Sequence, residues 1–91
     1  MKPKSGRKQT SFEDLAKLIY STKDKSLLKD FLLGLTTPYE RKILARRVDI
    51  IKRLLTDEQQ EKIAQDLGVG VSTVSRGSRE LVLGRFKILK K

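Results

Sequence analysis

Residues 60–76 read QEKIAQDLGVGVSTVSR, which is the most informative stretch of the chain. Its apolar residues recur at the spacing of two short helices joined by a tight turn, in which Gly68 would supply the left-handed backbone. The residues expected to pack the two helices together are Ile63, Ala64, Leu67, Val69 and Val74. The expected caps are Thr56 or Asp57 for the first helix and Ser72 for the second. The pattern predicts a helix-turn-helix over about residues 58–82.

The second helix of this motif is polar on the side that does not pack, apart from Val71. Such a helix can lie in the major groove of DNA, with its N-terminal residues on base edges and its flanks on phosphates. The alternative is a plain pair of helices within a helical domain, and the basic charge of the chain favours DNA. The residues expected to contact DNA are Gln60, Lys62, Val71, Ser72, Thr73, Ser75, Arg76 and Arg79.

Apolar residues at helical spacing predict three more helices before the motif. The first begins near Thr10, which would form a capping box with Glu13, and the second covers residues 26–35. The third has Thr37 as its N-cap and Pro38 at its first position. No alternation typical of strands is present. We therefore expect an all-α chain of five to six short helices, the sixth near the C-terminus.

The composition excludes several kinds of chemistry. The 91 residues include no cysteine and no histidine, so disulfides, thiolate metal sites and the commonest general base are absent. We expect no metal and no enzymatic activity. No apolar run approaches the length of a membrane span, and the N-terminus lacks the apolar core of a secretory signal. These features predict a cytoplasmic protein without a membrane partner.

The excess positive charge lies at the two ends of the chain. The net charge is +10, and residues 1–9 and 85–91 each carry four basic residues and no acidic one. Basic ends suit nucleic acid through phosphate contacts, and the alternatives are a role in solubility or contact with an anionic membrane. We expect residues 1–9 to form a basic disordered arm and residues 10–91 a single helical domain.

Two residues depart from the helical pattern. Arg47 falls inside the apolar stripe of the third helix, where it either reaches water, pairs with a carboxylate such as Glu40 or Asp30, or faces an anionic ligand. Gly77 stands inside the second helix of the motif, where glycine costs about 1 kcal/mol relative to alanine. Helical periodicity alone explains neither residue.

Two stretches of the chain resemble the tryptophan repressor family. They are LTTPYERKILARRVDIIKRLL at residues 35–55 and GVGVSTVSRGSREL at residues 68–81. The resemblance covers about residues 30–82. It implies an intertwined all-helical homodimer that presents one helix-turn-helix per subunit to a double-stranded DNA operator. It also implies L-tryptophan as corepressor, bound between the dimer core and the helix-turn-helix.

The resemblance further implies a set of ligand-binding residues. In the family the indole lies between two arginines, which match Arg47 and Arg76 here, and the second also takes the carboxylate. The other matching positions are Thr37, Thr73, Gly77 and Glu80. The family has a small hydroxyl residue where Glu80 stands, and that position receives the ligand ammonium. Glu80 would either bind this ammonium or pair with Arg76 and oppose ligand entry.

We therefore expect a sequence-specific DNA-binding transcriptional repressor that L-tryptophan or a related small molecule controls as corepressor. The alternative is a constitutive DNA-binding helix-turn-helix module without a ligand, in which Glu80 occupies the pocket.

Overall fold

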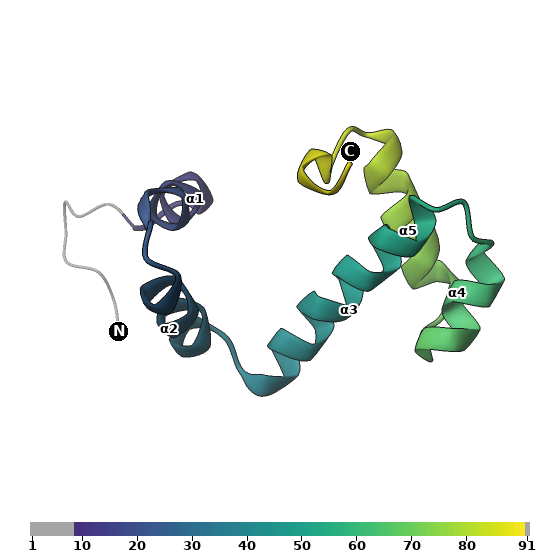
Figure 1. Ribbon diagram of the computed structural model, residues 1–91, viewed down its shortest axis with the longest axis horizontal. Coiled ribbons are helices and arrows are strands. Elements are labelled where there is room, and N and C mark those ends of the chain that lie inside the picture. Colours follow the sequence, from purple (N-terminus) through teal and green to yellow (C-terminus); the bar gives the residue numbers. More distant parts are fainter. Residues whose placement is uncertain (1–8, 91) are drawn as a thin grey trace. The chain divides into compact units, whose positions relative to one another are not determined.

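The computed structural model of the chain describes residues 9–90, and every helix or strand assigned in that range is a helix (Figure 1). The all-α prediction is therefore confirmed. The described residues form two compact units, one ending at Thr37 and the other beginning at Pro38. The elements are α1 (Phe12–Ser21), α2 (Lys25–Leu35), α3 (Pro38–Leu54), α4 (Gln60–Leu67), α5 (Val71–Val82) and the 3-10 turn η1 (Lys87–Leu89).

The first helix of the first unit begins one residue later than predicted. Ser11 is its N-cap and accepts a hydrogen bond from the backbone N–H of Asp14 at 3.0 Å. The Asp14 carboxylate in turn accepts from the Ser11 N–H at 3.2 Å, which completes the capping box. The predicted box of Thr10 and Glu13 is wrong because the neighbouring pair has the same spacing and the same chemistry.

The two helices of the first unit bury none of their residues. Phe12 is 83% exposed and Tyr20 is 90% exposed, although both belong to apolar helix faces. Asp24 caps α2 by accepting from the Leu27 N–H at 3.0 Å, so the helix itself is well formed. Within the first unit, these helices thus leave apolar surface uncovered.

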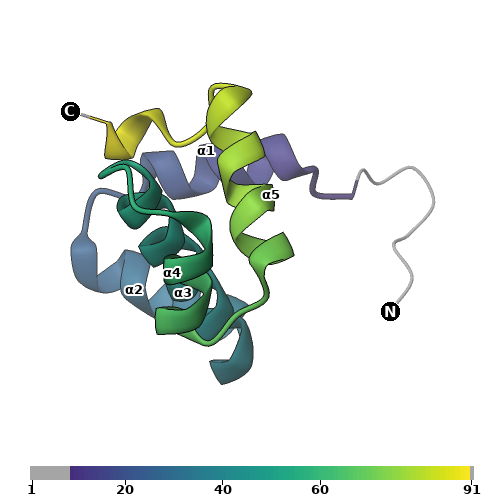
Figure 2. The ribbon, with the colours of Figure 1, turned by 90° about the vertical axis from the view of Figure 1, so that its right-hand side faces the viewer.

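The second unit has a core in which α3, α4 and α5 contact one another pairwise (Figures 1 and 2). The helix α3 begins at Pro38, as predicted from the fixed φ of proline. Among the described residues of this unit, five are buried, and three partly buried residues pack against four of these five. The buried residues are Ile50, Ile51, Ile63, Ala64 and Val74, and the partly buried ones are Leu54, Leu67 and Val69.

The helix-turn-helix is confirmed in α4, the turn after it and α5. Gly68 has φ 67° and ψ 38°, the left-handed conformation that glycine adopts without strain. The Val69 N–H donates to the Ala64 carbonyl at 3.0 Å and closes the end of α4. Ile63 and Val74 are fully buried across the helix pair. The packing positions expected from the sequence are therefore the ones that hold the motif together.

The predicted cap of α4 is wrong. Its N-cap is Gln59, which makes no side-chain capping bond. Thr56 instead donates its hydroxyl to the Arg53 carbonyl at 2.8 Å, at the end of α3. Asp57 has φ 62° and serves the turn between the two helices. Aspartate tolerates the left-handed conformation better than most residues, which explains its use there.

The predicted cap of α5 is also wrong. The helix begins at Val71, so Gly70 is the N-cap and Ser72 lies inside the first turn. The Thr73 N–H donates to the Gly70 carbonyl at 3.1 Å, which fixes this earlier start. Glycine is a tolerated N-cap, and it leaves the first N–H groups of α5 without a side-chain partner.

The basic arm predicted for residues 1–9 falls, except for Gln9, outside the described residues. In the part of the chain that the structure covers, no helix combines the length and the apolar character needed to cross a membrane.

Candidate functional site

The helices α3 and α5 cross closely at Gly77. A Cβ atom built on Gly77 would lie 3.1 Å from Cδ1 of Ile51 and 3.3 Å from Cγ2 of Ile50. Ordinary side-chain contacts are about 3.5–4.0 Å, so any larger residue would push the helices apart or displace the isoleucines. The glycine that looked out of place in the sequence is therefore explained by helix packing.

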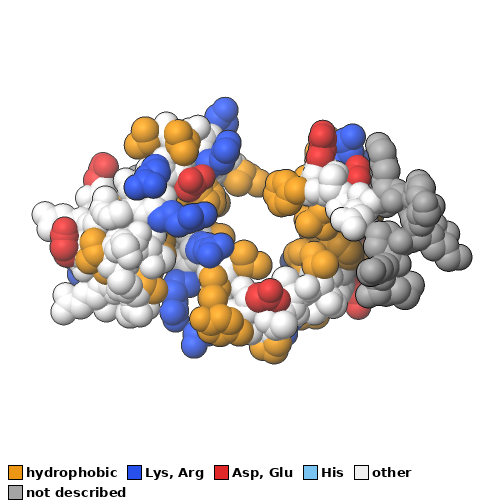
Figure 3. Space-filling view, turned by 180° about the vertical axis from the view of Figure 1, so that it is seen from behind, with side chains coloured by type: hydrophobic (Ala, Val, Ile, Leu, Met, Phe, Trp, Pro, Cys, Tyr) orange, Lys and Arg blue, Asp and Glu red, His pale blue; other side chains and the backbone are white. Residues whose placement is uncertain are grey.

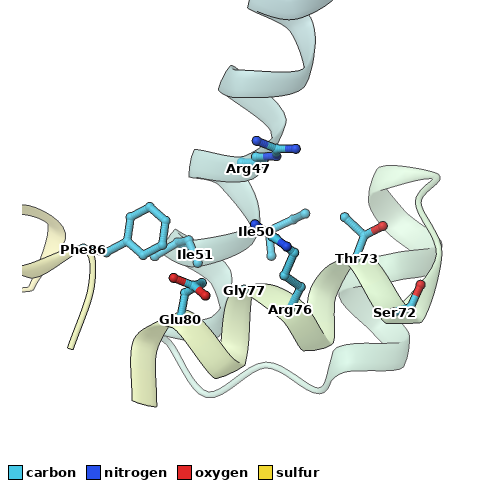
Figure 4. A pocket seen from close by; sticks show the side chains of 9 residues that line it. All are labelled: Arg47, Ile50, Ile51, Ser72, Thr73, Arg76, Gly77, Glu80 and Phe86. Atoms are coloured by element: carbon cyan, nitrogen blue, oxygen red, sulfur yellow. The ribbon is translucent and has the colours of Figure 1, made fainter. Parts of the chain in front are cut away.

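Beside this crossing lies a cavity of about 400 Å³ within the second unit (Figure 4). The helices α3 and α5 form most of it, and the segment after α5 adds one residue. The lining residues are Arg47, Ile50, Ile51, Ser72, Thr73, Arg76, Gly77, Glu80 and Phe86. The volume falls within the range of small-molecule sites, and the aliphatic and aromatic lining is typical of them.

Two arginines reach the cavity from different helices. Arg47 comes from α3 and Arg76 from α5 (Figure 4). Within residues 9–90, neither guanidinium makes a hydrogen bond or an ion pair with another side chain. Among the described residues of its own unit, Arg47 has no carboxylate partner, so the pairing with Glu40 is not formed, and Asp30 belongs to the other unit. A guanidinium without a protein partner is available to bind a carboxylate or to stack on an aromatic ring.

Glu80 brings a negative charge to the same cavity. Its carboxylate lies 3.5 Å from Nε of Arg85, which follows α5. The structure pairs Glu80 with Arg85, and among the described residues it shows no ion pair between Glu80 and Arg76. The cavity thus combines two guanidinium groups with one carboxylate.

Phe86 reaches the cavity because the chain reverses after α5. Gly84 has φ 91° and Phe86 has φ 63°, so two residues within three positions adopt left-handed backbone. The Arg85 N–H donates to the Glu80 carbonyl at 3.0 Å and ties this turn to α5. Figure 4 shows the Phe86 ring beside Ile51 and Glu80. The sequence signal for this return was Gly84 alone, so Phe86 was not expected in the site.

The structure brings together five of the six residues expected to bind a ligand. Arg47, Thr73, Arg76, Gly77 and Glu80 all line the cavity. Thr37 lies in the other unit, immediately before α3, and is not among the lining residues of this cavity. Sequence reasoning missed Ile50, Ile51 and Phe86. It also placed Ser72 on the DNA surface alone, whereas Ser72 lines the cavity as well.

A second cavity of about 330 Å³ adjoins the first and shares three of its residues. It extends along α3 to Arg46 and Tyr39 and reaches Gly70 at the start of α5. Arg46 lines this second cavity and not the first.

The surface residues expected to contact DNA are mostly exposed, and two of them contact each other. The Ser75 hydroxyl donates to the Gln60 side-chain oxygen at 2.6 Å, which joins α5 to α4. Lys62 lies 3.4 Å from Asp66 in an exposed pair one turn apart. Val71, Ser72, Thr73, Arg76 and Arg79 are exposed on α5. The hydrogen bond between Ser75 and Gln60 holds α5 against α4.

An ion-pair network attaches the motif to the end of α3. Arg53 lies 2.5 Å from Glu58 and 2.6 Å from Asp66 of α4. Its guanidinium, hydrogen-bonded to both carboxylates, lowers the pKa of Glu58 and the pKa of Asp66 below their ordinary values. The same two bonds raise the pKa of Arg53 further, so this charge is permanent. The network orients α4 relative to the α3 side of the cavity.

The second unit carries more basic than acidic residues. Residues 38–90 contain twelve lysines and arginines against seven aspartates and glutamates. In Figure 3, lysine and arginine side chains gather on the visible face of this unit. A basic face beside a helix-turn-helix is the electrostatic footprint of nucleic-acid binding.

The fold and the site together define an all-helical regulator of the helix-turn-helix class. The family model described as Trp repressor protein matches residues 10–88 of the chain. The chain belongs to the Trp repressor family. Members of this family are regulatory DNA-binding proteins and not enzymes, and the chain is accordingly a transcriptional repressor.

The similar proteins include Trp operon repressor homologs from several Vibrio species. The homolog of Vibrio campbellii is 42% identical over 71 residues, which are 77% of this chain and 71% of the relative. The homolog of Vibrio vulnificus (strain YJ016) is 39% identical over 75 residues, 81% of this chain and 74% of the relative. The homolog of Vibrio cholerae is 42% identical over 69 residues, which are 75% of this chain and 64% of the relative.

Proposed function

We propose that this repressor binds operator DNA as a homodimer and that L-tryptophan, or a closely related aromatic amino acid, acts as its corepressor in the cavity between α3 and α5. Tryptophan is the corepressor of the family in general.

One observation carries the ligand part of the proposal. Arg47 and Arg76 lie in one cavity with no protein partner among residues 9–90. An indole stacked on guanidinium gains cation–π energy of about 0.5–2 kcal/mol, and a carboxylate can take two parallel hydrogen bonds from the same group. The apolar lining of Ile50, Ile51 and Phe86 suits the remainder of an aromatic side chain.

Ligand binding and DNA binding would be coupled through α5. Its N-terminal residues Ser72 and Thr73 belong to the proposed DNA surface and also line the cavity. A ligand that contacts both α3 and α5 favours one placement of α5 on the core. If that placement matches the major groove, ligand affinity and DNA affinity rise together.

The proposed DNA surface consists of the exposed side of α5 and the start of α4. Base and phosphate contacts would come from Val71, Ser72, Thr73, Arg76 and Arg79, with Gln60, Lys62 and Ser75 beside them. The basic face of the second unit supplies the non-specific attraction to phosphates.

The proposed homodimer follows from the uncovered apolar surface. Since α1 and α2 bury none of their residues within their own unit, a second copy would give them a core. Leu44 and Val48 of α3 are 49% and 37% exposed and add to the surface in need of cover. Residues 10–91 would then act as one domain that is completed by the partner.

Selection of duplexes from a random DNA library, followed by affinity measurements with and without L-tryptophan, tests this function. The expected result is a selected sequence that the protein binds several-fold more tightly when L-tryptophan is present. Equal operator affinity with and without every aromatic amino acid would contradict the corepressor role and favour a constitutive DNA-binding module.

A further inference from the structure

The charges around the cavity are arranged in two groups. Arg76 points from α5 toward α3, with Arg47 on the facing helix, and Glu80 lies one helical turn farther along α5 (Figure 4). Such a cavity matches a zwitterion, because a molecule with one carboxylate and one ammonium can satisfy both groups at once. A molecule with a carboxylate alone would face Glu80 as an unfavourable like charge.

Glu80 already has a charged partner within the chain. Nε of Arg85 lies 3.5 Å from its carboxylate, and the turn that delivers Arg85 is held by the backbone bond from the Arg85 N–H to the Glu80 carbonyl. The Arg85 side chain is 68% exposed and the Glu80 side chain 31%. Exposed ion pairs are weak, about 0.2–1 kcal/mol, so a ligand can displace this one.

We propose that Arg85 is an internal counter-ion for Glu80, and that the ligand's ammonium replaces it, so that Glu80 and Arg85 together make the site select ammonium-bearing ligands over their des-amino analogues. This inference rests on the proposed ligand site and adds the group that sets its selectivity. The ligand class is an aromatic α-amino acid in its zwitterionic form.

The exchange predicts opposite effects for the two partners. Removing the charge of Glu80 should weaken L-tryptophan binding and relieve the repulsion that an analogue without an ammonium meets. Removing the charge of Arg85 should strengthen L-tryptophan binding, because the ligand no longer competes with an internal cation. A des-amino analogue gains nothing from that second change, since it has no group for Glu80.

Isothermal titration calorimetry with L-tryptophan and indole-3-propionate tests this. Wild type should prefer L-tryptophan by about tenfold or more, as expected for one charge-assisted hydrogen bond. Glu80→Gln should reduce the preference to near one. Arg85→Gln should bind L-tryptophan about two- to fivefold more tightly. Lys87→Gln removes a charge from the same segment, and it should leave both affinities near those of wild type.

Three results would overturn the proposal. Wild type that binds indole-3-propionate as tightly as L-tryptophan, or a Glu80→Gln variant that keeps the wild-type preference, would remove the role of Glu80. An Arg85→Gln variant indistinguishable from Lys87→Gln would remove the role of Arg85. If no variant bound either compound, the proposed ligand site itself would be wrong, which separates that failure from a failure of selectivity alone.

Discussion

Gly77 is the residue on which the helix packing and the cavity both depend. Its missing side chain lets α5 approach Ile50 and Ile51 of α3, and its backbone forms part of the cavity wall. Helix propensity alone favours alanine at this position, and the contact with α3 opposes it. The atoms that a Cβ at this position would meet are methyl groups of side chains, so these side chains can shift slightly to make room for it.

Gly77→Ala is expected to destabilise the protein by about 1 kcal/mol, because overpacking of about 1–3 kcal/mol outweighs a propensity gain of about 1 kcal/mol. Gly34→Ala is the matched control. Gly34 also lies in a helix, and nothing within 4 Å opposes a Cβ there, so this change should stabilise by up to about 1 kcal/mol. Urea unfolding measures both. Equal stabilisation by the two substitutions would show that the α3–α5 contact is not limiting.

Arg47 is the residue that distinguishes a ligand site from a packing surface. Arg47→Ala should weaken L-tryptophan binding by about three- to thirtyfold, as expected from the loss of one stacked guanidinium. Arg46 is the preceding arginine and lines only the neighbouring cavity, so Arg46→Ala should have little effect on L-tryptophan binding. Calorimetry on the pair provides the comparison. If Arg46→Ala lost more L-tryptophan affinity than Arg47→Ala, the ligand would bind in the neighbouring cavity instead.

At the scale of elements, the helix-turn-helix is held to the core by two different kinds of contact. The apolar residues of α4 and α5 pack on one another and on the end of α3. Arg53 adds a charged connection from α3 to Glu58 and to Asp66 of α4. The apolar contacts do not change with pH, whereas the charged connection does. Acid therefore separates their contributions to the stability of the motif.

Lowering the pH should weaken this connection in a defined window. Arg53 holds the pKa of Glu58 below 4.5 and that of Asp66 below 3.8 in the folded protein. The unfolded chain therefore binds protons first as the pH falls, and the stabilisation is present above about pH 5 and lost progressively below it. Unfolding followed by circular dichroism from pH 7 to pH 3 measures this loss.

Arg53→Gln should be less stable than wild type at neutral pH and should lose less stability in acid. Lys52→Gln, which removes a charge from the adjacent position, should lose stability with falling pH as wild type does. If Arg53→Gln also lost stability as wild type does, other carboxylates would dominate the acid response.

At the level of the whole molecule, the two helices of the first unit have no apolar core within that unit. Its two helices expose their apolar faces and have no buried residue, and burial contributes about 25 cal/mol per Å² of apolar surface. Small domains commonly gain the missing core by association. The apolar faces of α1 and α2 are thus the expected contact surface between two copies.

Sedimentation equilibrium should therefore give the mass of two chains at micromolar concentration. Phe12→Asp places a charge on an 83% exposed aromatic position of α1 and should shift the equilibrium toward monomer. Lys23→Gln, in the connection between α1 and α2, makes the net charge more negative by the same amount away from the apolar faces, and this variant should remain dimeric. A monomeric wild type at these concentrations would contradict the proposed dimer.

The helix-turn-helix was predictable because its packing residues sit at fixed offsets within one short stretch, from Ile63 to Val74. The caps were less predictable, since residues 10–13 and 11–14 offer equivalent boxes and only the backbone geometry selects Ser11. Phe86 and Arg85 entered the site through a reversal at Gly84 that no periodicity indicates. The cavity was anticipated at Arg47 and Gly77 because each contradicts its surroundings, although Gly77 proved to serve helix packing too.

The most direct test is calorimetry of L-tryptophan with the protein free and bound to its selected operator. DNA should tighten L-tryptophan binding by the same factor by which L-tryptophan tightens DNA binding, since the coupling is reciprocal. Arg47→Ala should weaken L-tryptophan binding in both states. L-tryptophan affinity that is unchanged by operator DNA, or the absence of binding in either state, would contradict the claim that this cavity controls the repressor.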